Sequence, residues 1–570
     1  MTNLTNRPHS VAQGSELKAQ SSRLTAHGSS DIERLISSYT SGKLSRHAFV
    51  RRLLALGVSI GFVETLLGIN ARRALAAPAR QFVPSRPPYF VLVVMDAFRA
   101  DYINLAPMPN LEWLMSQGTT FPRAWVGQLE SYTPASHATL STGATPAHHG
   151  VLGFDWRDPK TGQETYTGWY ADVIAGRLEQ QLQAHGVNSI PQALKRSDPN
   201  ARIVALSSEK YYAADAMGGS AADYIIYGHP QGKSIVTLGI PHHLPPETFL
   251  QSKGLTRPWP LSYGQFDNMS MTMALESLRT LDPRALMINL PGPDIYGHRV
   301  GGPATPSVMT RLIRGCDSQL KRLITALRNR GVLDQTVLVI TGDHGMVRNT
   351  YQIDENILKQ TVRDAGGDYL FHTGGSSAYI WLRNPAVAPK VAQHLVDTLH
   401  HTPFAHHQTI QSGTYTYHPV VRTGWSLDPA LEAAYQYLLG TFAGPLAPDI
   451  ALAFEEDTIT RVYTDAHGEH GSATWGAQQV PLVITGPGVK RGKVSEFPAR
   501  LMDVAPTVLT LLGIEPVNMD GVVLTDALTA PTKAQQNAQD KVADALTAYQ
   551  RAIMARSQVD QMMQRPFRKG

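Results

Sequence analysis

Runs of consecutive apolar residues, many of them β-branched, recur along the chain and predict buried strands. Residues 91–95 read Val-Leu-Val-Val-Met, and residues 336–340 read Thr-Val-Leu-Val-Ile. Similar runs occupy 202–206, 284–290 and 480–485. An uninterrupted apolar run is typical of a strand buried on both faces of a parallel sheet. Helix-like stretches such as 308–330 alternate with the runs, so the pattern predicts a doubly wound, mostly parallel α/β domain.

The spacing of the runs predicts the domain organisation. Between the runs at 336–340 and 480–485, residues 377–382 and 449–454 predict strands and 391–400 a helix, which indicates a small α+β cap at 366–450. The catalytic domain then comprises 78–365 and 451–530. Within it, the segment 178–265 is rich in Gly, Pro and His, and we expect it to be a loop-heavy insertion. Residues 531–570 form a tail with an apolar helical stripe that we expect to dock on the body: Val542, Leu546, Tyr549 and Ile553.

Residues 1–77 differ from the rest of the chain. Their first thirty residues are polar and predict disorder, and the stretch Ser45-Arg46-His47-Ala48-Phe49-Val50-Arg51 is followed by an apolar run at 53–69 and then by small residues at 74–77. A basic segment, an apolar segment and then small residues follow one another in this order in an export signal. The basic stretch resembles a twin-arginine signal in which His47 replaces the second arginine. It predicts the twin-arginine export machinery as a partner and a periplasmic or cell-surface location in a bacterium. An uncleaved membrane anchor and an amphipathic or buried helix are the alternatives.

Charge argues against a nucleic-acid partner. The whole chain carries a net charge of +5, but residues 1–77 carry +6, which leaves −1 for the remainder. A near-neutral body lacks the basic surface of a nucleic-acid-binding protein. The single cysteine, Cys316, excludes an intrachain disulfide and is expected to be a small buried hydrophobe.

Side chains that bind metals follow the predicted strands or precede the last one. They are three carboxylates and three imidazoles: Asp96, Asp294, His298, Asp343, His344 and His470. Ligands bind beyond the carboxyl ends of strands in open α/β sheets, so we expect these groups to converge. Mixed nitrogen and oxygen ligation suits zinc, with manganese or iron as alternatives. Six ligands exceed the three usual for one catalytic metal and predict two divalent ions about 4 Å apart.

A hydroxyl nucleophile is predicted in the segment 130–143. Pro134 disfavours helix at Thr133, so we expect a helix to start near Ser136. A hydroxyl at a helix N-terminus lies in a field that favours anions, and a metal would lower its pKa further. Composition alone leaves four candidates: Ser131, Thr133, Ser136 and Thr139.

Residues 89–528 resemble the alkaline phosphatase superfamily, specifically its type I phosphodiesterase/nucleotide pyrophosphatase branch. The motifs that carry the resemblance occur in the expected order: Met95-Asp96-Ala-Phe-Arg, Thr133-x-x-x-His137-x-x-x-x-Thr142-Gly143, His149-Gly150, Asp294-x-x-x-His298, Gly342-Asp343-His344-Gly345, His470-Gly471, 502–513 and Asp520-Gly521.

The resemblance implies a role for each residue. One metal would be held by Asp96, Thr133, Asp343 and His344, and the other by Asp294, His298 and His470. Thr133 would attack phosphorus of a small-molecule phosphate ester, and water would then hydrolyse a phospho-threonine intermediate. The implied activity is that of a phosphodiesterase or nucleotide pyrophosphatase, with an alkaline phosphatase that cleaves monoesters as the alternative.

One departure from the family pattern concerns the phosphate oxygens. The family commonly has an asparagine shortly after His-Gly, whereas this chain reads Gly153-Phe154-Asp155-Trp156. We therefore expect the Thr133 backbone N–H or a substrate-binding Lys210 to stabilise the transferring group. The commoner interpretation of Lys210 is a solvated surface lysine.

Other classes fit less well. A sulfatase needs a Cys or Ser where this chain has Thr133, and a cytoplasmic phosphomutase conflicts with an export signal. A non-catalytic binding protein conflicts with the complete ligand set.

The sequence shows no clear extra cation to meet the additional anionic oxygen of a monoester, so we expect the site to prefer diesters. The cap would supply an apolar or stacking surface for the diester substituent: Tyr379, Trp381, Tyr415 and Tyr417.

Overall fold

The computed structural model describes residues 34–35, 37–38 and 89–564, apart from 167–168, 253, 259–260, 303–305 and 462–466. The predicted export signal, with Arg46, His47 and the apolar run 53–69, lies outside the described residues. Among the helices that are described, none is both long and apolar enough to cross a membrane. The account below concerns the compact unit that begins at Phe82.

A ten-stranded sheet forms the centre of this unit, in the order β21-β2-β20-β10-β1-β9-β5-β6-β7-β8. Its middle strands are mutually parallel: β10 (Thr336–Thr341), β1 (Tyr89–Met95), β9 (Ala285–Leu290), β5 (Ile203–Ser207) and β6 (Tyr224–Gln231). Strands β20 (Leu482–Thr485) and β7 (Ser234–Gly239) run antiparallel to their inner neighbours, and the edges are completed by β2 (Gly118–Thr120), β21 (Lys493–Val494) and β8 (Arg257–Pro258). The prediction of a doubly wound, mostly parallel sheet is confirmed.

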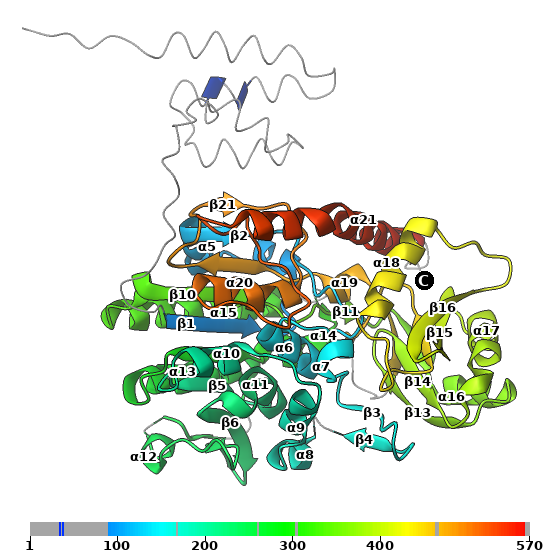
Figure 1. Cartoon of the computed structure of the whole chain (residues 1–570), viewed down its shortest axis with the longest axis horizontal. Helices are drawn as coiled ribbons and strands as arrows, with labels where there is room; N and C mark the ends of the chain where they lie inside the picture. The colour runs from blue at the N-terminus through cyan, green and yellow to red at the C-terminus, as the bar shows by residue number, and fades with distance from the viewer. Residues whose placement is uncertain are drawn as a thin grey trace, which may run out of the picture. The chain divides into compact units, whose positions relative to one another are not determined.

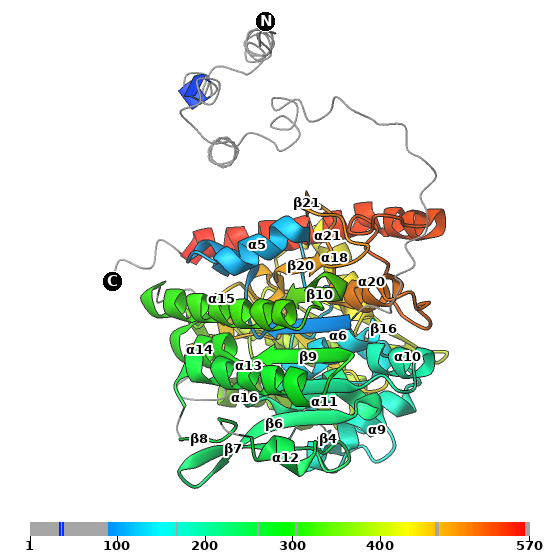
Figure 2. The same ribbon diagram turned by 90° about the vertical axis from the view of Figure 1, so that its left-hand side faces the viewer.

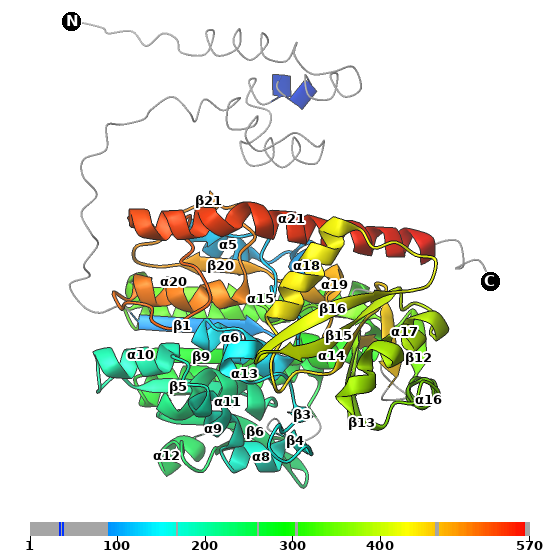
Figure 3. The same cartoon turned by 45° about the vertical axis from the view of Figure 1, so that its right-hand side comes forward.

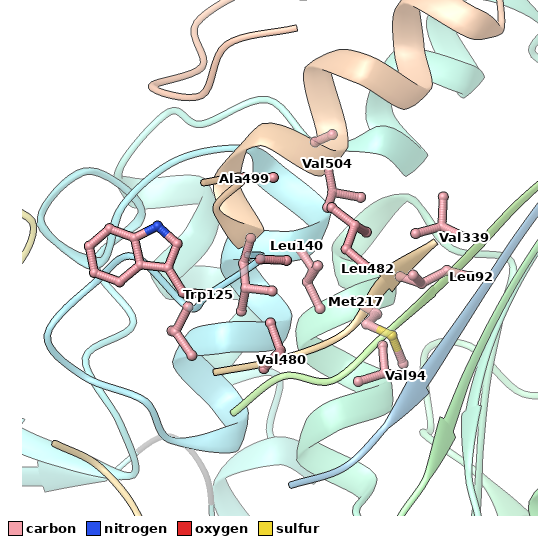
Figure 4. Packing of buried hydrophobic residues seen from close by; sticks show 14 of the residues in the cluster. Leu92, Val94, Trp125, Leu140, Met217, Val339, Val480, Leu482, Ala499 and Val504 are labelled. Carbon is pink, nitrogen blue, oxygen red and sulfur yellow. The ribbon is translucent and has the colours of Figure 1, made fainter. Parts of the chain in front are cut away.

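The side chains of β1 alternate between two cores because successive residues of a strand point to opposite faces. Val91, Val93 and Met95 pack with residues of α5 (Pro109–Gln117), α13 (Tyr263–Thr280) and α15 (Pro306–Asn329). Phe90, Leu92 and Val94 pack with residues of α6 (Thr133–Thr142), α11 (Tyr211–Gly218) and α20 (Val504–Leu511). Figure 2 shows the helices around the sheet, and Figure 4 shows Leu92 and Val94 beside Leu140 of α6 and Met217 of α11.

A second, five-stranded sheet forms the cap, in the order β13 (Tyr369–Gly374), β14 (Ala378–Leu382), β17 (Ile450–Ala453), β15 (Phe404–Gln411) and β16 (Thr414–Val421). Helices α16 (Glu355–Asp364) and α17 (Ala388–Thr398) pack on it through an apolar core of their own (Figure 3). The cap is therefore wider than the predicted 366–450. Helix α16 precedes that range, and β17, which pairs between β14 and β15, continues beyond it.

Two further segments complete the fold. Residues 178–265, expected to be loop-heavy, contain four strands of the main sheet (β5, β6, β7 and β8) and the helix α11, so that expectation was wrong. The C-terminal helix α21 (Lys533–Gln564) crosses α18 (Pro429–Gly440), as Figure 1 shows. Leu546 and Ile553 of α21 are buried in the main core, so the apolar stripe docks as predicted.

Candidate active site

Three neighbouring strands bring the predicted metal ligands to one edge of the main sheet. Asp96 follows β1, Asp343 and His344 follow β10, and α14 (Gly292–Val300) follows β9 and carries Asp294 and His298. These strands are parallel and in register, so their carboxyl ends lie side by side. The structure thus brings together side chains that are up to 248 residues apart in the chain.

His470 lies at the same edge of the sheet, but it does not follow a strand of the main sheet. It follows β19 (Gly468–Glu469), which pairs with β11 (Val347–Arg348), and β11 begins three residues after His344. The rings of His344 and His470 stack with their centroids 3.7 Å apart. Ligand atoms of Asp96, Asp343 and His344 lie within 4.8 Å of one another, as do those of Asp294, His344 and His470.

Each ligand histidine has its Nδ1 tied to a backbone carbonyl. His298 donates to Gly468 O at 2.9 Å, His470 to Ser131 O at 3.0 Å, and His344 to Gly345 O at 2.9 Å. Since a carbonyl only accepts, Nδ1 carries the proton, and in the neutral ring Nε2 keeps its lone pair. Metal-binding histidines are usually oriented in this way.

The Nε2 atoms of these three histidines also lie close to carboxylate oxygens. His344 Nε2 lies 3.2 Å from Asp343 Oδ2, and the Nε2 atoms of His298 and His470 lie 3.3 and 3.4 Å from Asp294 Oδ1. Both carboxylate oxygens are buried and have no hydrogen-bond partner among the residues that the structure describes. A neutral imidazole nitrogen and a carboxylate oxygen at this distance repel each other unless a cation lies near both, so the contacts of His344 and His470 fit divalent metal ions.

The pKa values are those expected of a crowded, desolvated site. Burial, followed by the charge of Asp96, raises the pKa of Asp343 to about 7. Burial lowers the pKa of His344 and of His470, which keeps both imidazoles neutral. Burial acts in the same direction on His298, but the charges of Asp294 and Glu469 raise its pKa well above the ordinary value. A metal that binds His298 must therefore displace a proton.

Thr133 is the hydroxyl that the fold places among these groups. Its Oγ1 lies 3.2 Å from His344 Nε2 and 3.2 Å from Lys210 Nζ. It is the first residue of α6, which starts three residues earlier than predicted because a proline such as Pro134 is tolerated in the first turn of a helix.

The rival hydroxyls make no hydrogen bond to the described side chains of the ligand cluster. Ser131 Oγ accepts hydrogen bonds from the backbone N–H groups of Gly471 and Ser472. Thr139 Oγ1 donates to Gln128 at 2.6 Å, and Ser136 Oγ is buried with no partner in the described part of the chain. Among the four candidates, Thr133 is thus the one whose hydroxyl contacts the metal-ligand cluster in the described part of the chain.

Lys210 lies at the centre of the site, so its interpretation as a surface lysine was wrong. Only 3% of the residue is exposed, and its Nζ lies 3.0 Å from Asp96 Oδ1 and 2.6 Å from Asp294 Oδ2. Burial alone would lower the pKa of Lys210, but these two carboxylates raise it well above the ordinary value. The side chain therefore carries a fixed positive charge beside the Thr133 hydroxyl.

Behind the metal ligands lie buried polar residues whose contacts were not predicted from the sequence. Asn289 of β9 donates to Asp96 Oδ2 at 2.7 Å and to His137 Nε2 at 3.1 Å, and its Oδ1 accepts from Ser207 at 2.9 Å. His137 in turn donates from Nδ1 to Thr133 O at 2.8 Å. Every polar atom of the Asn289 side chain is used, so the residue fixes Asp96 and His137 relative to each other. The signal was present, since Asn289 is the one polar residue of an otherwise apolar strand.

A cavity of about 530 Å³ opens onto the site. Thr133, Lys210, Asp294, His298 and His470 lie at one part of its lining. The remaining lining has one basic residue, Arg299, and is otherwise mostly aromatic, acidic or apolar; it includes Glu130, Tyr132, Leu152, Phe154, Asp155, Trp169, Glu209, Tyr212, Trp381, Phe442 and Glu469. Substrate groups next to the reacting phosphorus would contact this lining.

The cap contributes less to the cavity than expected. Of the four aromatic residues predicted to form a substrate surface, Trp381 lines the cavity. Tyr379 donates to Gly471 O and Tyr417 to Pro448 O, so both are structural, and Tyr415 lines a separate depression. Phe154, Trp169 and Tyr212 supply the aromatic surface instead.

The mixed central sheet, with helices on both faces and carboxylates and imidazoles at its edge, defines an alkaline phosphatase-like fold. Solved structures share it: murine ectonucleotide pyrophosphatase/phosphodiesterase 5 has a TM-score of 0.55 at 17% identity, and the alkaline phosphatase PafA a TM-score of 0.59 at 14% identity. These alignments cover 77% and 78% of this chain and 100% of the other chains.

A model of the type I phosphodiesterase/nucleotide pyrophosphatase family matches residues 90–473. The chain belongs to this family. Among curated relatives, alkaline phosphatase PhoK of Sphingomonas is 27% identical over 27% of this chain and 29% of its own length. Bis(5'-adenosyl)-triphosphatase enpp4 of Xenopus laevis is 24% identical over 46% of this chain and 48% of its own length. The chain thus spans less than half the length of these two relatives. A related structure is an inactive threonine-to-alanine variant of the murine enzyme in complex with AMP.

Proposed function

We propose that this protein is a metal-dependent phosphate ester hydrolase that acts through a phospho-threonine intermediate. One observation carries the proposal: the hydroxyl of Thr133 lies 3.2 Å from both His344 Nε2 and Lys210 Nζ, within the cluster of carboxylates and imidazoles. The family membership and the inactive threonine variant of a structural neighbour support it.

The proposed reaction is a double displacement. Thr133 Oγ1 forms a bond to phosphorus while the bond from phosphorus to the leaving alkoxide breaks, and water later hydrolyses the phospho-threonine. Lys210, charged and buried, would offset the negative charge of the phosphoryl oxygens, in the role that the family asparagine fills elsewhere. The layer of Asn289 and His137 would hold Asp96 and the first turn of α6 in place.

This site would hold two divalent ions. Its mixed nitrogen and oxygen donors suit zinc. Asp96, Thr133, Asp343 and His344 would hold one, and Asp294, His298 and His470 the other. Such ions lower the pKa of a hydroxyl nucleophile and stabilise the charge of the attacking and leaving oxygens. The orphaned oxygens of Asp294 and Asp343 support this assignment.

Substitution of Thr133 tests the reaction. Thr133→Ala should abolish turnover of nitrophenyl phosphate esters, while the melting temperature and metal content stay close to those of the wild type. Ser136→Ala is the matched control, because it removes a hydroxyl from the same helix that makes no hydrogen bond. Near-wild-type activity of Thr133→Ala with its metals bound would refute the assignment.

Phosphodiesters and pyrophosphates are the substrates that the family favours, and a phosphomonoesterase is the second candidate. Lys210 supports the second candidate, because a monoester presents an additional anionic oxygen that the ammonium would meet. The comparison to make is kcat/KM for bis-nitrophenyl phosphate against nitrophenyl phosphate.

Export by the twin-arginine route remains a proposal from residues 45–77. That route accepts folded cargo, which suits a metal-loaded enzyme with a single cysteine. A reporter fused to residues 1–77 should reach the periplasm, and Arg46→Lys should block its export. A reporter that stays in the cytoplasm would refute export, and export that survives Arg46→Lys would point to another route.

A further inference from the structure

His470 is the one predicted metal ligand that no element of the main sheet carries. The other five follow β1 or β10, or lie on α14 directly after β9. His470 instead begins a short irregular stretch between β19 and α19 (Trp475–Gln478), whose first three residues, 470–472, we call the His470 segment. The position of this ligand therefore depends on what binds the His470 segment.

The residues just before the proposed nucleophile bind the His470 segment. His470 Nδ1 donates to Ser131 O at 3.0 Å. Ser131 Oγ accepts from the backbone N–H groups of Gly471 and Ser472 at 3.0 and 3.1 Å. Gly471 has a φ of +92°, and a Cβ there would lie 2.6 Å from Tyr132 Cζ, so this position requires glycine.

The cap also binds the His470 segment. Ser376, in the turn between β13 and β14, donates its backbone N–H to His470 O at 3.0 Å. Gly471 O accepts two further hydrogen bonds, one from Ser377 Oγ and one from Tyr379 Oη at 2.9 Å. Three donors of the cap thus fix two consecutive carbonyl groups beside the imidazole of the ligand.

These contacts are close and closed to solvent. Each of the three cap residues is at most 4% exposed. A Cβ at Gly375 would lie 2.5 Å from His470 O and would collide with the Tyr132 hydroxyl, so glycine allows the turn to approach the ligand. Gly375 donates its N–H to Thr460 Oγ1 at 2.8 Å, which fixes the turn. A buried carbonyl that loses its donors must move or stay unpaired, so loss of these bonds should displace His470.

We propose that the cap is a positioning element of the metal site: Ser377 and Tyr379 hold His470 in place for the metal that it would share with Asp294 and His298. The proposal rests on the two-metal site of the proposed function and adds the part of the fold that secures one of the two positions. Residues that orient a metal ligand typically contribute about 10–100-fold to metal affinity or activity.

The two metal positions should differ in how far they depend on the cap. Asp96, Asp343 and His344 follow strands of the main sheet, and their side chains hydrogen-bond groups of the catalytic domain, such as Asn289 and the Ala97 backbone. A change in the cap donors should therefore weaken chiefly the metal position that includes His470.

Zinc binding by Tyr379→Phe tests this role. The variant keeps the aromatic ring and loses the hydrogen bond to Gly471 O. Competition between the zinc-loaded protein and a chromophoric chelator gives both zinc affinities without any turnover. One affinity should fall by about tenfold while the other stays within about threefold. Ser377→Ala combined with Tyr379→Phe should enlarge the loss, and His470→Ala should lose the same affinity, which identifies the position.

Tyr417→Phe is the matched control, because Tyr417 is also a buried tyrosine of the cap that donates to a backbone carbonyl, Pro448 O, at 2.7 Å. It should lower the melting temperature about as much as Tyr379→Phe does and keep both zinc affinities. Equal losses of zinc affinity in the two variants would show a general effect of cap stability and overturn the positioning role.

The outcomes separate this proposal from the proposed function. Wild-type zinc affinities in Tyr379→Phe and in the double variant would overturn the role of the cap and leave the proposed function standing. A wild type that shows the expected zinc affinities but hydrolyses no phosphate ester would defeat the proposed function and leave the role of the cap intact. A wild type that binds fewer than two zinc ions would defeat both.

Discussion

Lys210 shows how a single residue can acquire its role from the fold alone. In the sequence it follows a short strand with no sign of burial, so a solvated lysine was the reasonable expectation. In the structure its ammonium contacts Asp96, Thr133 and Asp294, which come from three separate segments. The metal ligands could be predicted because their types are chemically restricted and their motifs ordered, whereas a lysine is informative only once its neighbours are known.

At this scale we predict that Lys210→Ala changes the choice of substrate. Loss of the ammonium should reduce kcat/KM for nitrophenyl phosphate by about tenfold or more relative to the diester, which corresponds to about 1.4 kcal/mol of transition-state stabilisation. The reason is that the monoester has one more anionic oxygen to neutralise. Lys195→Ala is the control, because Lys195 pairs with Asp223 and contacts none of the site residues. An equal loss on both substrates would show that Lys210 has a structural role only.

Secondary-structure elements were predictable where their apolar pattern was uninterrupted. Strands β1, β5, β9, β10 and β20 coincide with the predicted runs to within two residues at each end. Strand β6 was missed because Gly228, His229 and Pro230 interrupt it, and it forms only because β5 and β7 flank it. Regular structure there depends on long-range pairing, which a local pattern does not report.

Helix α14 offers a prediction at the scale of the element. Its Gly292 lies against Asp267, whose Oδ1 accepts from Gly292 N at 2.8 Å, and a Cβ at Gly292 would lie 2.5 Å from Asp267 Oδ2. Because Asp267 is buried on α13, Gly292→Ala should displace the start of α14 and lower stability by about 1–3 kcal/mol. Asp294, two residues further on, should move with it, so kcat should fall as well.

Gly264→Ala provides the comparison, since Gly264 lies in the first turn of α13 and a Cβ there meets nothing within 4 Å. This control should be neutral or slightly stabilising. Thermal unfolding and kcat of both variants are the measurements. Wild-type stability and activity in Gly292→Ala would show that α14 tolerates the added group without moving.

Across the whole molecule, metal binding should be coupled to folded stability. We predict about two bound divalent ions per chain, and a melting temperature that falls on chelation and recovers when zinc is restored, because a ligand that binds only the folded state stabilises it by mass action. Elemental analysis and thermal unfolding with and without chelator check this. One ion per chain, or none in protein purified without chelators, would contradict the two-metal site.

The distribution of the ligands along the chain has a consequence for the order of events during synthesis. Asp96 directly follows the first strand of the sheet, whereas His470 is added only after the entire cap. At about 5–20 residues per second, the ribosome adds the last ligand tens of seconds after the first. A nascent chain thus carries an incomplete set of buried carboxylates and imidazoles for most of its translation. Binding of two metals would consequently require a chain that extends past His470, and the compartment in which the chain completes its folding would determine which metal it acquires.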